Sequence, residues 1–186
     1  MTGRPTDPVP PSPGVGRGTP GRPTALVVTV STRAAAGVYA DRSGPVLAEG
    51  LSARGFLVDG PVVVPDGEGV EAVLRDAVAR GIDVVLTTGG TGLAPSDVTP
   101  EMTRRVLERE VPGVAEEIRR RGAVAGVSAA VLSRGLAGTA GGTFVVNVAG
   151  STGACRDAMA VLAGVLEHGV QQLHGEDHGS RPPAGT

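Results

Sequence analysis

Short runs of β-branched residues alternate along this chain with longer amphipathic stretches, and this alternation restricts the fold more than any other feature. The runs are nearly continuous in apolar residues, which is typical of strands that are buried on both faces of a sheet. Strands that alternate with helices build βαβ units and hence a largely parallel sheet. Five runs are predicted to be strands: Ala25–Val30, Leu57–Val64, Ile82–Thr88, Ser128–Ser133 and Thr143–Val148.

The stretches between these runs have the spacing of amphipathic helices. Thr99 is interpreted as a helix N-cap followed by proline at the first helical position, and Pro112 begins another helix in the same way. The predicted helices are Arg42–Arg54, Glu68–Arg80, Pro100–Arg109, Pro112–Arg121 and Thr152–Leu173.

The link between the last two predicted strands, RGLAGTAGG, contains no helix. A parallel crossover needs about a dozen residues or more, so we expect these two strands to form an antiparallel hairpin at the edge of the sheet. The sequence therefore predicts a three-layer α/β/α fold with a mostly parallel sheet and one antiparallel edge hairpin.

The chain has 186 residues, which is the length of one domain. Residues 1–23 hold seven of the 15 prolines and five glycines, so this segment has too little apolar surface to offset the entropy of ordering it. We expect residues 1–23 and 175–186 to be disordered tails on either side of one α/β domain, residues 24–174.

The composition excludes several functions. All 17 basic residues are arginine, so a phosphate-binding or Schiff-base lysine is absent. The few aromatic residues and the net charge of −2 argue against nucleic acid as a partner. The chain shows neither an export signal nor a long apolar stretch, so we expect a soluble, cytoplasmic protein that does not bind membranes.

Three groups of residues are interpreted as structural. Cys155 is expected to be a packed small residue, because no base partner for a nucleophile is evident. The run from Arg119 to Arg121 is expected to be a solvated helix end. The residues His168, His174, Glu176, Asp177 and His178 resemble metal ligands, but they reach into a polar tail and are expected to be solvated.

Polar and glycine-rich segments follow the predicted strands. In open α/β sheets, ligands bind beyond the carboxyl ends of the strands, so these segments are expected to meet at one edge. The stretch from Thr88 to Gly92 is a glycine-rich loop that lets backbone N–H groups approach a phosphate. Taken alone, such a loop is more often a tight turn than a ligand site.

Asp66 and Asp97 each follow a different strand, and together they are suited to hold Mg²⁺ with the phosphates of a nucleotide. Taken singly, either aspartate could instead be a helix cap or an Asx-turn. Ser133, Asn147 and Ser151 offer neutral donors and acceptors for a polar heterocycle, although Ser151 could also cap the final helix.

Six segments occur in this order along the chain: VSTRAAAGVYADRSG, VVVPDGE, TTGGTGLAPSDVTPE, PGVAEEIR, LSRGLAG and VVNVAGS. Together they resemble the molybdopterin adenylyltransferase family, the Mog/MoaB-type molybdopterin-binding proteins that include the gephyrin and plant Cnx G domains. The resemblance covers residues 24–173. The TTGGTG loop with its following Asp and TPE is specific to this superfamily.

The resemblance implies a MogA-like α/β/α protein that forms a homotrimer or hexamer and works with other proteins of molybdenum cofactor biosynthesis. It implies transfer of AMP from ATP to molybdopterin, with Mg²⁺ as cofactor and pyrophosphate as product. The implied catalytic and Mg²⁺-binding residues are Asp66 and Asp97. The substrate-binding residues that it implies are Thr88, Gly89, Gly90, Thr91, Gly92, Ser133, Asn147, Gly150 and Ser151. Ser31, Arg33 and Arg134, which belong to the polar segments at the strand ends, complete the predicted binding site.

The chain departs from the family pattern at two positions. Thr32 stands where many relatives have Asp, which removes an acid near the site, and Ala149 stands where they have Pro, which loosens a turn. The alternative function is a non-catalytic, trimeric molybdopterin-binding or scaffold protein, because the family also contains members of doubtful catalytic competence and a fold does not fix a function. Retention of both Asp66 and Asp97 argues against this alternative. A competence-damage-type enzyme is a second alternative, but those proteins carry a further domain for which this chain has no room.

Overall fold

The computed structural model describes residues 22–175. The predicted disordered segments 1–23 and 175–186 lie outside the described residues, apart from residues 22, 23 and 175. Arg22 donates a hydrogen bond to the Gly55 carbonyl, and the Pro23 carbonyl accepts one from Leu57 N–H, so both residues lie against the domain.

A six-stranded mixed sheet forms the centre of the molecule, with the strand order β2-β1-β3-β6-β5-β4. Strands β2, β1, β3 and β6 are parallel to one another, whereas β5 is antiparallel to both of its neighbours. This arrangement confirms the predicted α/β class and the antiparallel hairpin. The strands are β1 (Thr24–Val30), β2 (Leu57–Val64), β3 (Val84–Thr88), β4 (Arg109–Glu110), β5 (Ala137–Ala140) and β6 (Thr143–Val148).

The predicted strand Ser128–Ser133 is wrong. Residues Ser128–Leu132 form a 3₁₀ helix, η1, on the surface, and Val131 and Leu132 are 60% and 52% exposed. The partner of β6 in the hairpin is instead β5, whose small residues hid it from a search for β-branched runs. Gly138 explains its composition, because a Cβ there would collide with the Arg109 carbonyl of β4.

Helices cover both faces of the sheet. The prediction is correct to the residue for α3, whereas the predicted final helix is wrong as one element, because it breaks at residues 163–165. Helix α1 and strand β4 were not predicted. The helices are α1 (Thr32–Ala35), α2 (Ser43–Ser52), α3 (Glu68–Arg80), α4 (Thr99–Arg104), α5 (Pro112–Val124), α6 (Thr152–Leu162) and α7 (Leu166–Leu173).

The predicted N-cap at Thr99 is also wrong. Thr99 is the first residue of α4, and no side chain caps this helix. Pro100 does lie in the first turn, where its missing N–H leaves no intrahelical bond unmade.

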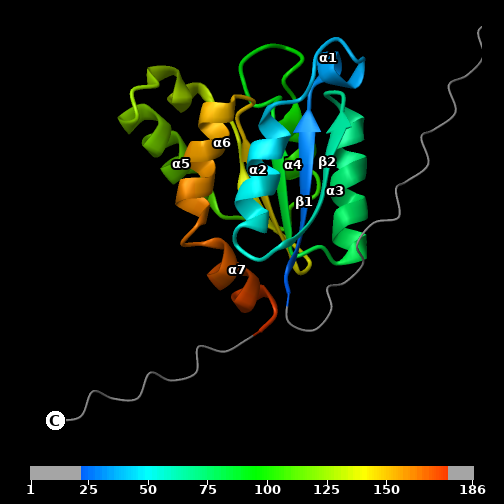
Figure 1. Ribbon diagram of the computed structural model, residues 1–186. Helices are drawn as coiled ribbons and strands as arrows, with labels where there is room; N and C mark the ends of the chain where they lie inside the picture. Colours follow the sequence, from blue (N-terminus) through cyan, green and yellow to red (C-terminus); the bar gives the residue numbers. More distant parts are fainter. Residues whose placement is uncertain (1–21, 176–186) are drawn as a thin grey trace, which may run out of the picture.

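Alternate residues of each central strand pack into two separate cores. Val27 and Leu86 contact the layer of α2, α5, α6 and α7, whereas Val28 and Val85 contact α3 and α4 on the other face. Figure 1 shows α2 and α6 in front of the sheet, with the carboxyl ends of the strands at the top together with α1. Packing in these two cores fixes the positions of the carboxyl ends of the parallel strands, where the loops of the candidate site begin.

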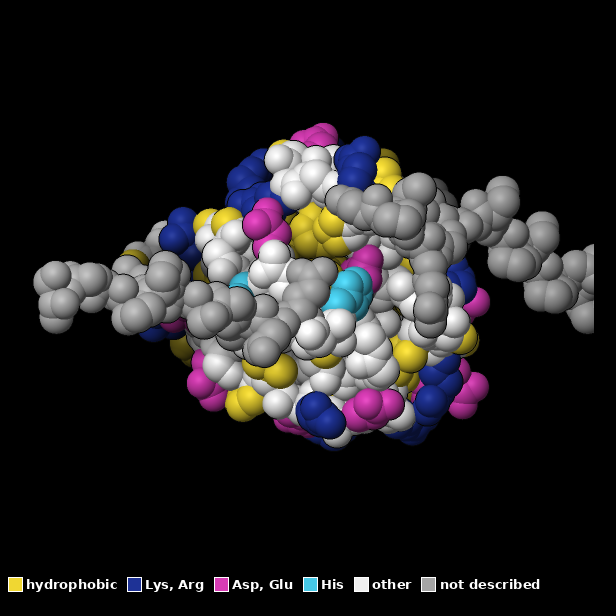
Figure 2. Space-filling view, turned by 90° about the horizontal axis from the view of Figure 1, so that it is seen from below, with side chains coloured by type: hydrophobic (Ala, Val, Ile, Leu, Met, Phe, Trp, Pro, Cys, Tyr) yellow, Lys and Arg dark blue, Asp and Glu magenta, His cyan; other side chains and the backbone are white. Residues whose placement is uncertain are grey.

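The opposite end of the molecule, where the strands begin, is seen in Figure 2, with acidic and basic side chains interspersed over it. The His174 imidazole Nε2 lies 2.8 Å from Oδ1 of Asp83. Glu176, Asp177 and His178 lie outside the described residues. Within residues 22–175, no three acidic, histidine or cysteine side chains are grouped to hold a metal ion, and no helix is long and apolar enough to cross a membrane.

A pH-dependent contribution to stability arises at Asp41, which precedes α2. Burial acts to raise the pKa of Asp41, but hydrogen bonds from the Thr29 hydroxyl and from Gly44 and Ser43 outweigh it and lower this pKa below 3.8. A carboxyl group with a lowered folded-state pKa stabilises the fold above its unfolded pKa, and this stabilisation is lost as the pH falls through the folded pKa.

We therefore expect Asp41→Asn to lower the free energy of unfolding at neutral pH by about 0.5–1 kcal/mol. This is the lower part of the range for a lost helix cap, because solvent screens the partly exposed carboxylate. The difference from the unmodified protein should shrink below pH 3.8. Urea unfolding at several pH values measures it, and a difference that grows on acidification would contradict the assignment.

Candidate functional site

A cavity of about 450 Å³ opens at the carboxyl ends of β3 and β6. The glycine loop, residues 89–92, forms one wall, and Ser151 and Ala154 at the start of α6 form another. Ala115 and Ile118 of α5 and Leu132 of η1 complete it with apolar side chains. Its position is the one at which open α/β sheets bind ligands, as the sequence predicts.

The glycine loop has a conformation that other residues rarely adopt. Gly89 and Gly90 have φ angles of +103° and +61°. A Cβ on Gly89 would collide with the Val30 carbonyl of the neighbouring strand, so the loop can pass this close only as glycine. Within the described chain, no acceptor receives a hydrogen bond from the N–H groups of Gly90, Thr91 and Gly92. Three such donors in succession are suited to an anionic oxygen.

Asp66 and Asp97 flank the glycine loop from two sides. Asp66 Oδ1 is buried and unpartnered, and it lies against Gly90, where a Cβ would be 2.5 Å away. Asp97 Oδ2 accepts a hydrogen bond of 3.1 Å from Ala94 N–H and lies against Gly92. Only Asp97 lines the cavity itself.

This pair of carboxylates fits a hard divalent cation such as Mg²⁺. Mg²⁺ prefers oxygen ligands, and proteins usually hold it through one or two carboxylates, with phosphates and water completing the shell. The buried, unpartnered oxygen of Asp66 is the observation that favours such a ligand, because a buried carboxylate oxygen normally has a partner.

Nine of the predicted site residues line the cavity, and five do not. Asp97 and Ser133 face it, and the Ser133 hydroxyl lies 3.0 Å from that of Thr91. The nine are Gly89, Gly90, Thr91, Gly92, Asp97, Ser133, Asn147, Gly150 and Ser151, and the five are Ser31, Arg33, Asp66, Thr88 and Arg134.

Two predicted binding side chains have structural partners instead. The Asn147 amide donates to the hydroxyls of Thr87 and Thr103, and its oxygen accepts from Leu136 N–H at 3.2 Å. Asn147 is only 3% exposed, so its side chain joins β6 to β3 and α4 while its backbone borders the cavity. The Ser151 hydroxyl caps α6 through Ala154 N–H, which was the alternative interpretation of this residue.

Thr88 lies behind the cavity wall. Its hydroxyl donates to the Ala149 carbonyl at 3.2 Å and lies 3.4 Å from the Cys155 sulfur. Cys155 is fully buried, and burial raises the pKa of its thiol. A thiol of this kind is unreactive, in agreement with the interpretation of Cys155 as a packed small residue.

Ser31 and Arg33 lie on α1 at the rim, outside the cavity. Ser31 caps α1, and its hydroxyl lies 3.0 Å from that of Tyr39. The Arg33 guanidinium stacks over the Tyr39 ring at 5.2 Å from its centre, which holds both exposed side chains in one place.

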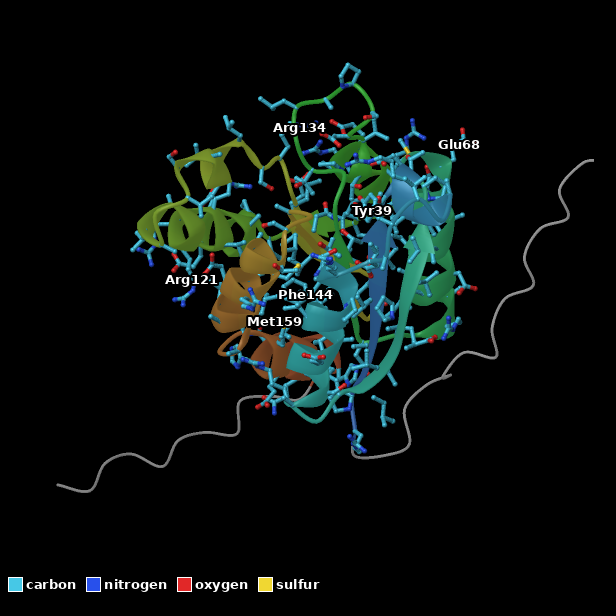
Figure 3. All side chains as sticks on the ribbon, turned by 45° about the horizontal axis from the view of Figure 1, so that its top comes forward. Tyr39, Glu68, Arg121, Arg134, Phe144 and Met159 are labelled. Atoms are coloured by element: carbon cyan, nitrogen blue, oxygen red, sulfur yellow. The ribbon has the colours of Figure 1, made fainter. Side chains whose placement is uncertain are left out.

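Arg134 holds the loop after β3 in place. Its Nε donates to the Gly92 carbonyl at 2.8 Å, and a terminal nitrogen donates to the Asp97 carbonyl. The same guanidinium pairs with Glu101, and its hydrogen bond lowers the pKa of that carboxyl below 4.5. Figure 3 shows Arg134 beneath this loop, so Arg134 orients the loop and does not face the cavity.

Replacement of Arg134 by methionine should loosen the loop that carries Asp97, because one guanidinium supplies all three contacts. We expect the loop to become more open to proteolysis and the melting temperature to fall by a few degrees, as for a loss of about 1–2 kcal/mol. Limited proteolysis with mass mapping tests this. Cleavage between residues 92 and 98 at the unmodified rate would contradict the role of Arg134.

The wall that α5 contributes to the cavity was not among the predicted site residues. Arg119, expected to be solvated, lines the cavity and donates to the carbonyls of Ser133 and Gly135. Ala115, Ile118, Arg119 and Gly122 recur with the helical spacing of one face, and all four line the cavity. That periodicity was the available signal.

The fold and the loops after its parallel strands define an α/β protein in which a glycine loop with three free N–H donors lies beside two carboxylates. The chain matches the model of a probable molybdopterin binding domain over residues 26–168. It therefore belongs to the MogA/MoaB family of molybdenum cofactor biosynthesis proteins, which confirms the resemblance seen in the sequence.

Relatives of the chain include enzymes and proteins with longer chains. The molybdopterin adenylyltransferase of Haemophilus influenzae is 38% identical over 140 residues, covering 72% of this chain and 69% of that protein. A molybdenum cofactor biosynthesis bifunctional protein of Chlorobaculum tepidum is 37% identical over 158 residues, covering 84% of this chain and 50% of that protein. The chain thus spans about half the length of this bifunctional relative.

Solved structures show the same fold. The Mog protein of Mycobacterium ulcerans superposes with a TM-score of 0.78 at 44% identity, covering 83% of this chain and 98% of that one. The tungsten cofactor synthesizing protein MoaB of Pyrococcus furiosus superposes with a TM-score of 0.76 at 30% identity, over 83% and 99% of the two chains.

Proposed function

We propose that this protein is a molybdopterin adenylyltransferase. In the proposed reaction, a phosphate oxygen of molybdopterin attacks the α-phosphorus of ATP. The new oxygen–phosphorus bond forms as the bond to the β-phosphate bridging oxygen breaks, and pyrophosphate leaves. The observation that carries this proposal is the glycine loop with three free N–H donors between two carboxylates.

The glycine loop would bind the phosphate oxygens. The N–H groups of Gly90, Thr91 and Gly92 are held in one orientation, because Gly89 is fixed beside Val30 and Arg134 is fixed to Gly92. Donors that are oriented before the ligand arrives need no reorganisation as charge develops in the transition state.

Asp66 and Asp97 would hold Mg²⁺ on either side of this loop. Bound Mg²⁺ supplies positive charge that offsets the charge on the phosphates. Nucleotidyl transfer requires little covalent chemistry from the protein, so positioning and charge compensation by these residues are expected to account for most of the rate. The apolar wall from α5 and η1 would contact the pterin, and the proposed assembly is a homotrimer.

Formation of the product tests this proposal. Purified protein is mixed with Mg²⁺, ATP and molybdopterin, and adenylylated molybdopterin is sought by mass spectrometry while pyrophosphate is measured. We expect both products to appear in equal amounts and only when all three components are present. Binding of molybdopterin without either product would favour the non-catalytic binding protein.

A further inference from the structure

Thr99 and Asp66 each have a buried polar atom without a partner, and both atoms lie beside Gly90. The Thr99 hydroxyl oxygen and Asp66 Oδ1 are both buried, and neither has a hydrogen-bond partner among the described residues. Thr99 itself is fully buried. Both atoms lie against the same face of Gly90, because a Cβ there would collide with Thr99 Oγ1 and would lie 2.5 Å from Asp66 Oδ1.

A carboxylate oxygen only accepts hydrogen bonds and has two lone pairs, so Asp66 Oδ1 can accept from a hydroxyl and still offer a lone pair to a cation. A threonine hydroxyl is a donor whose proton rotates freely. Two buried polar atoms of this kind are costly to leave unpaired, and a donor facing an acceptor removes both penalties in one bond. Thr99 is fixed for this role, because its N–H donates to the Gly90 carbonyl at 3.0 Å.

The other oxygen of Asp66 already has a threonine partner. The Thr32 hydroxyl donates to Asp66 Oδ2 at 3.0 Å, and Asp66 N–H donates back to Thr32 Oγ1 at 3.3 Å. Thr32 belongs to the exposed helix α1, so this contact lies on the outer side of the carboxylate, opposite the buried Gly90 side.

We propose that the hydroxyls of Thr32 and Thr99 are positioning residues that hold the Asp66 carboxylate from its two sides, Thr99 directly or through one buried water. The inference rests on the proposed function, since it assigns to this hydroxyl pair the orientation of Asp66 for the adenylyl transfer. The space that the pair needs also explains why the loop has glycine at position 90.

Isosteric variants separate this role from simple packing. Thr99→Val keeps the shape of the side chain and removes the hydroxyl, and Thr99→Ser restores it. Thr143→Val is a matched control, because Thr143 is also fully buried with an unpartnered hydroxyl but lies at the start of β6, at the other end of the sheet.

For the positioning role, we expect Thr99→Val to lower kcat about tenfold with KM for molybdopterin within about twofold, which is the signature of a contact that matters in the transition state. Thr99→Ser should recover most of kcat. Thr32→Val should lower kcat by about threefold, because its contact is open to water. Thr143→Val should leave kcat unchanged. Equal kcat in Thr99→Val and the unmodified protein would overturn the proposal.

A crystal structure tests the same contact without any activity. We expect Thr99 Oγ1 and Asp66 Oδ1 to form a direct hydrogen bond of about 2.7 Å or to be bridged by one ordered water. In Thr99→Val, we expect the Asp66 carboxylate to rotate. Two separate, unbridged oxygens, or an unchanged Asp66 in the variant, would overturn the positioning role. If the protein has this contact but does not catalyse adenylyl transfer, only the proposed function is rejected, and the contact between Thr99 and Asp66 stands.

Discussion

Replacement of Asp97 by asparagine is expected to lower adenylyl transfer roughly 100-fold or more, which is the scale of removing one preorganised electrostatic group from a site. Asp97 lines the cavity beside Gly92 and is one of the two carboxylates proposed to hold Mg²⁺. Asparagine keeps the acceptor for Ala94 N–H, so the loop should stay folded while the negative charge is lost. Molybdopterin binding should therefore change by no more than about threefold.

Asp76→Asn provides the matched control for this variant. Asp76 lies on α3, with its side chain 58% exposed, and its ion pair with Arg80 is at the surface, where such a pair contributes little. We expect its turnover to equal that of the unmodified protein. Turnover is followed by pyrophosphate release, and binding is followed by titration calorimetry. An Asp97→Asn protein with normal turnover would remove Asp97 from the site.

Replacement of Gly89 by alanine is expected to destabilise the whole domain by about 3 kcal/mol or more. A positive φ at a non-glycine residue costs on the order of 1–3 kcal/mol, and the new Cβ would in addition collide with the backbone carbonyl of Val30. Backbone of a central strand cannot move aside cheaply, because Val30 is buried between β2 and β3. Urea unfolding measures the loss.

Gly37→Ala separates the collision from the backbone angle. Gly37 has a φ of +72°, but a Cβ there would meet nothing within 4 Å. We expect this variant to lose only about 1 kcal/mol, the cost of the left-handed conformation. Equal losses in the two variants would show that close packing of the glycine loop on β1 contributes nothing.

The central layers could be predicted from sequence because burial on both faces leaves a direct pattern. The runs that became β1, β3 and β6 are nearly continuous in apolar residues and buried along their length, and α3 begins and ends at its predicted residues. Strand β2 is different, because it lies at the edge of the sheet, is only partly buried and is interrupted by Asp59, Gly60 and Pro61. Strand β5 left no such pattern. Gly138 has no side chain because this position must approach the Arg109 backbone, and the pairing joins segments that are distant in sequence.

Some residues of the candidate site could likewise be predicted from the sequence, whereas the roles of others could not. Asp97 and the glycine loop were predicted from their place after buried strands, and they line the cavity. The roles of Arg134 and Asn147 depend on contacts across more than one element, so residue type alone suggested ligand binding for side chains that hold the scaffold. Sequence gives the loop from which a residue comes, whereas packing decides the direction of its side chain.

The origin of the transferred group is the most direct test of the proposed reaction. Two parallel reactions contain Mg²⁺, molybdopterin and ATP that carries radioactive phosphorus either at the α or at the γ position. We predict that the α label appears in the molybdopterin product and that the γ label appears in pyrophosphate. Transfer of the γ label to molybdopterin, or no transfer of either label while molybdopterin binds, would contradict adenylyl transfer.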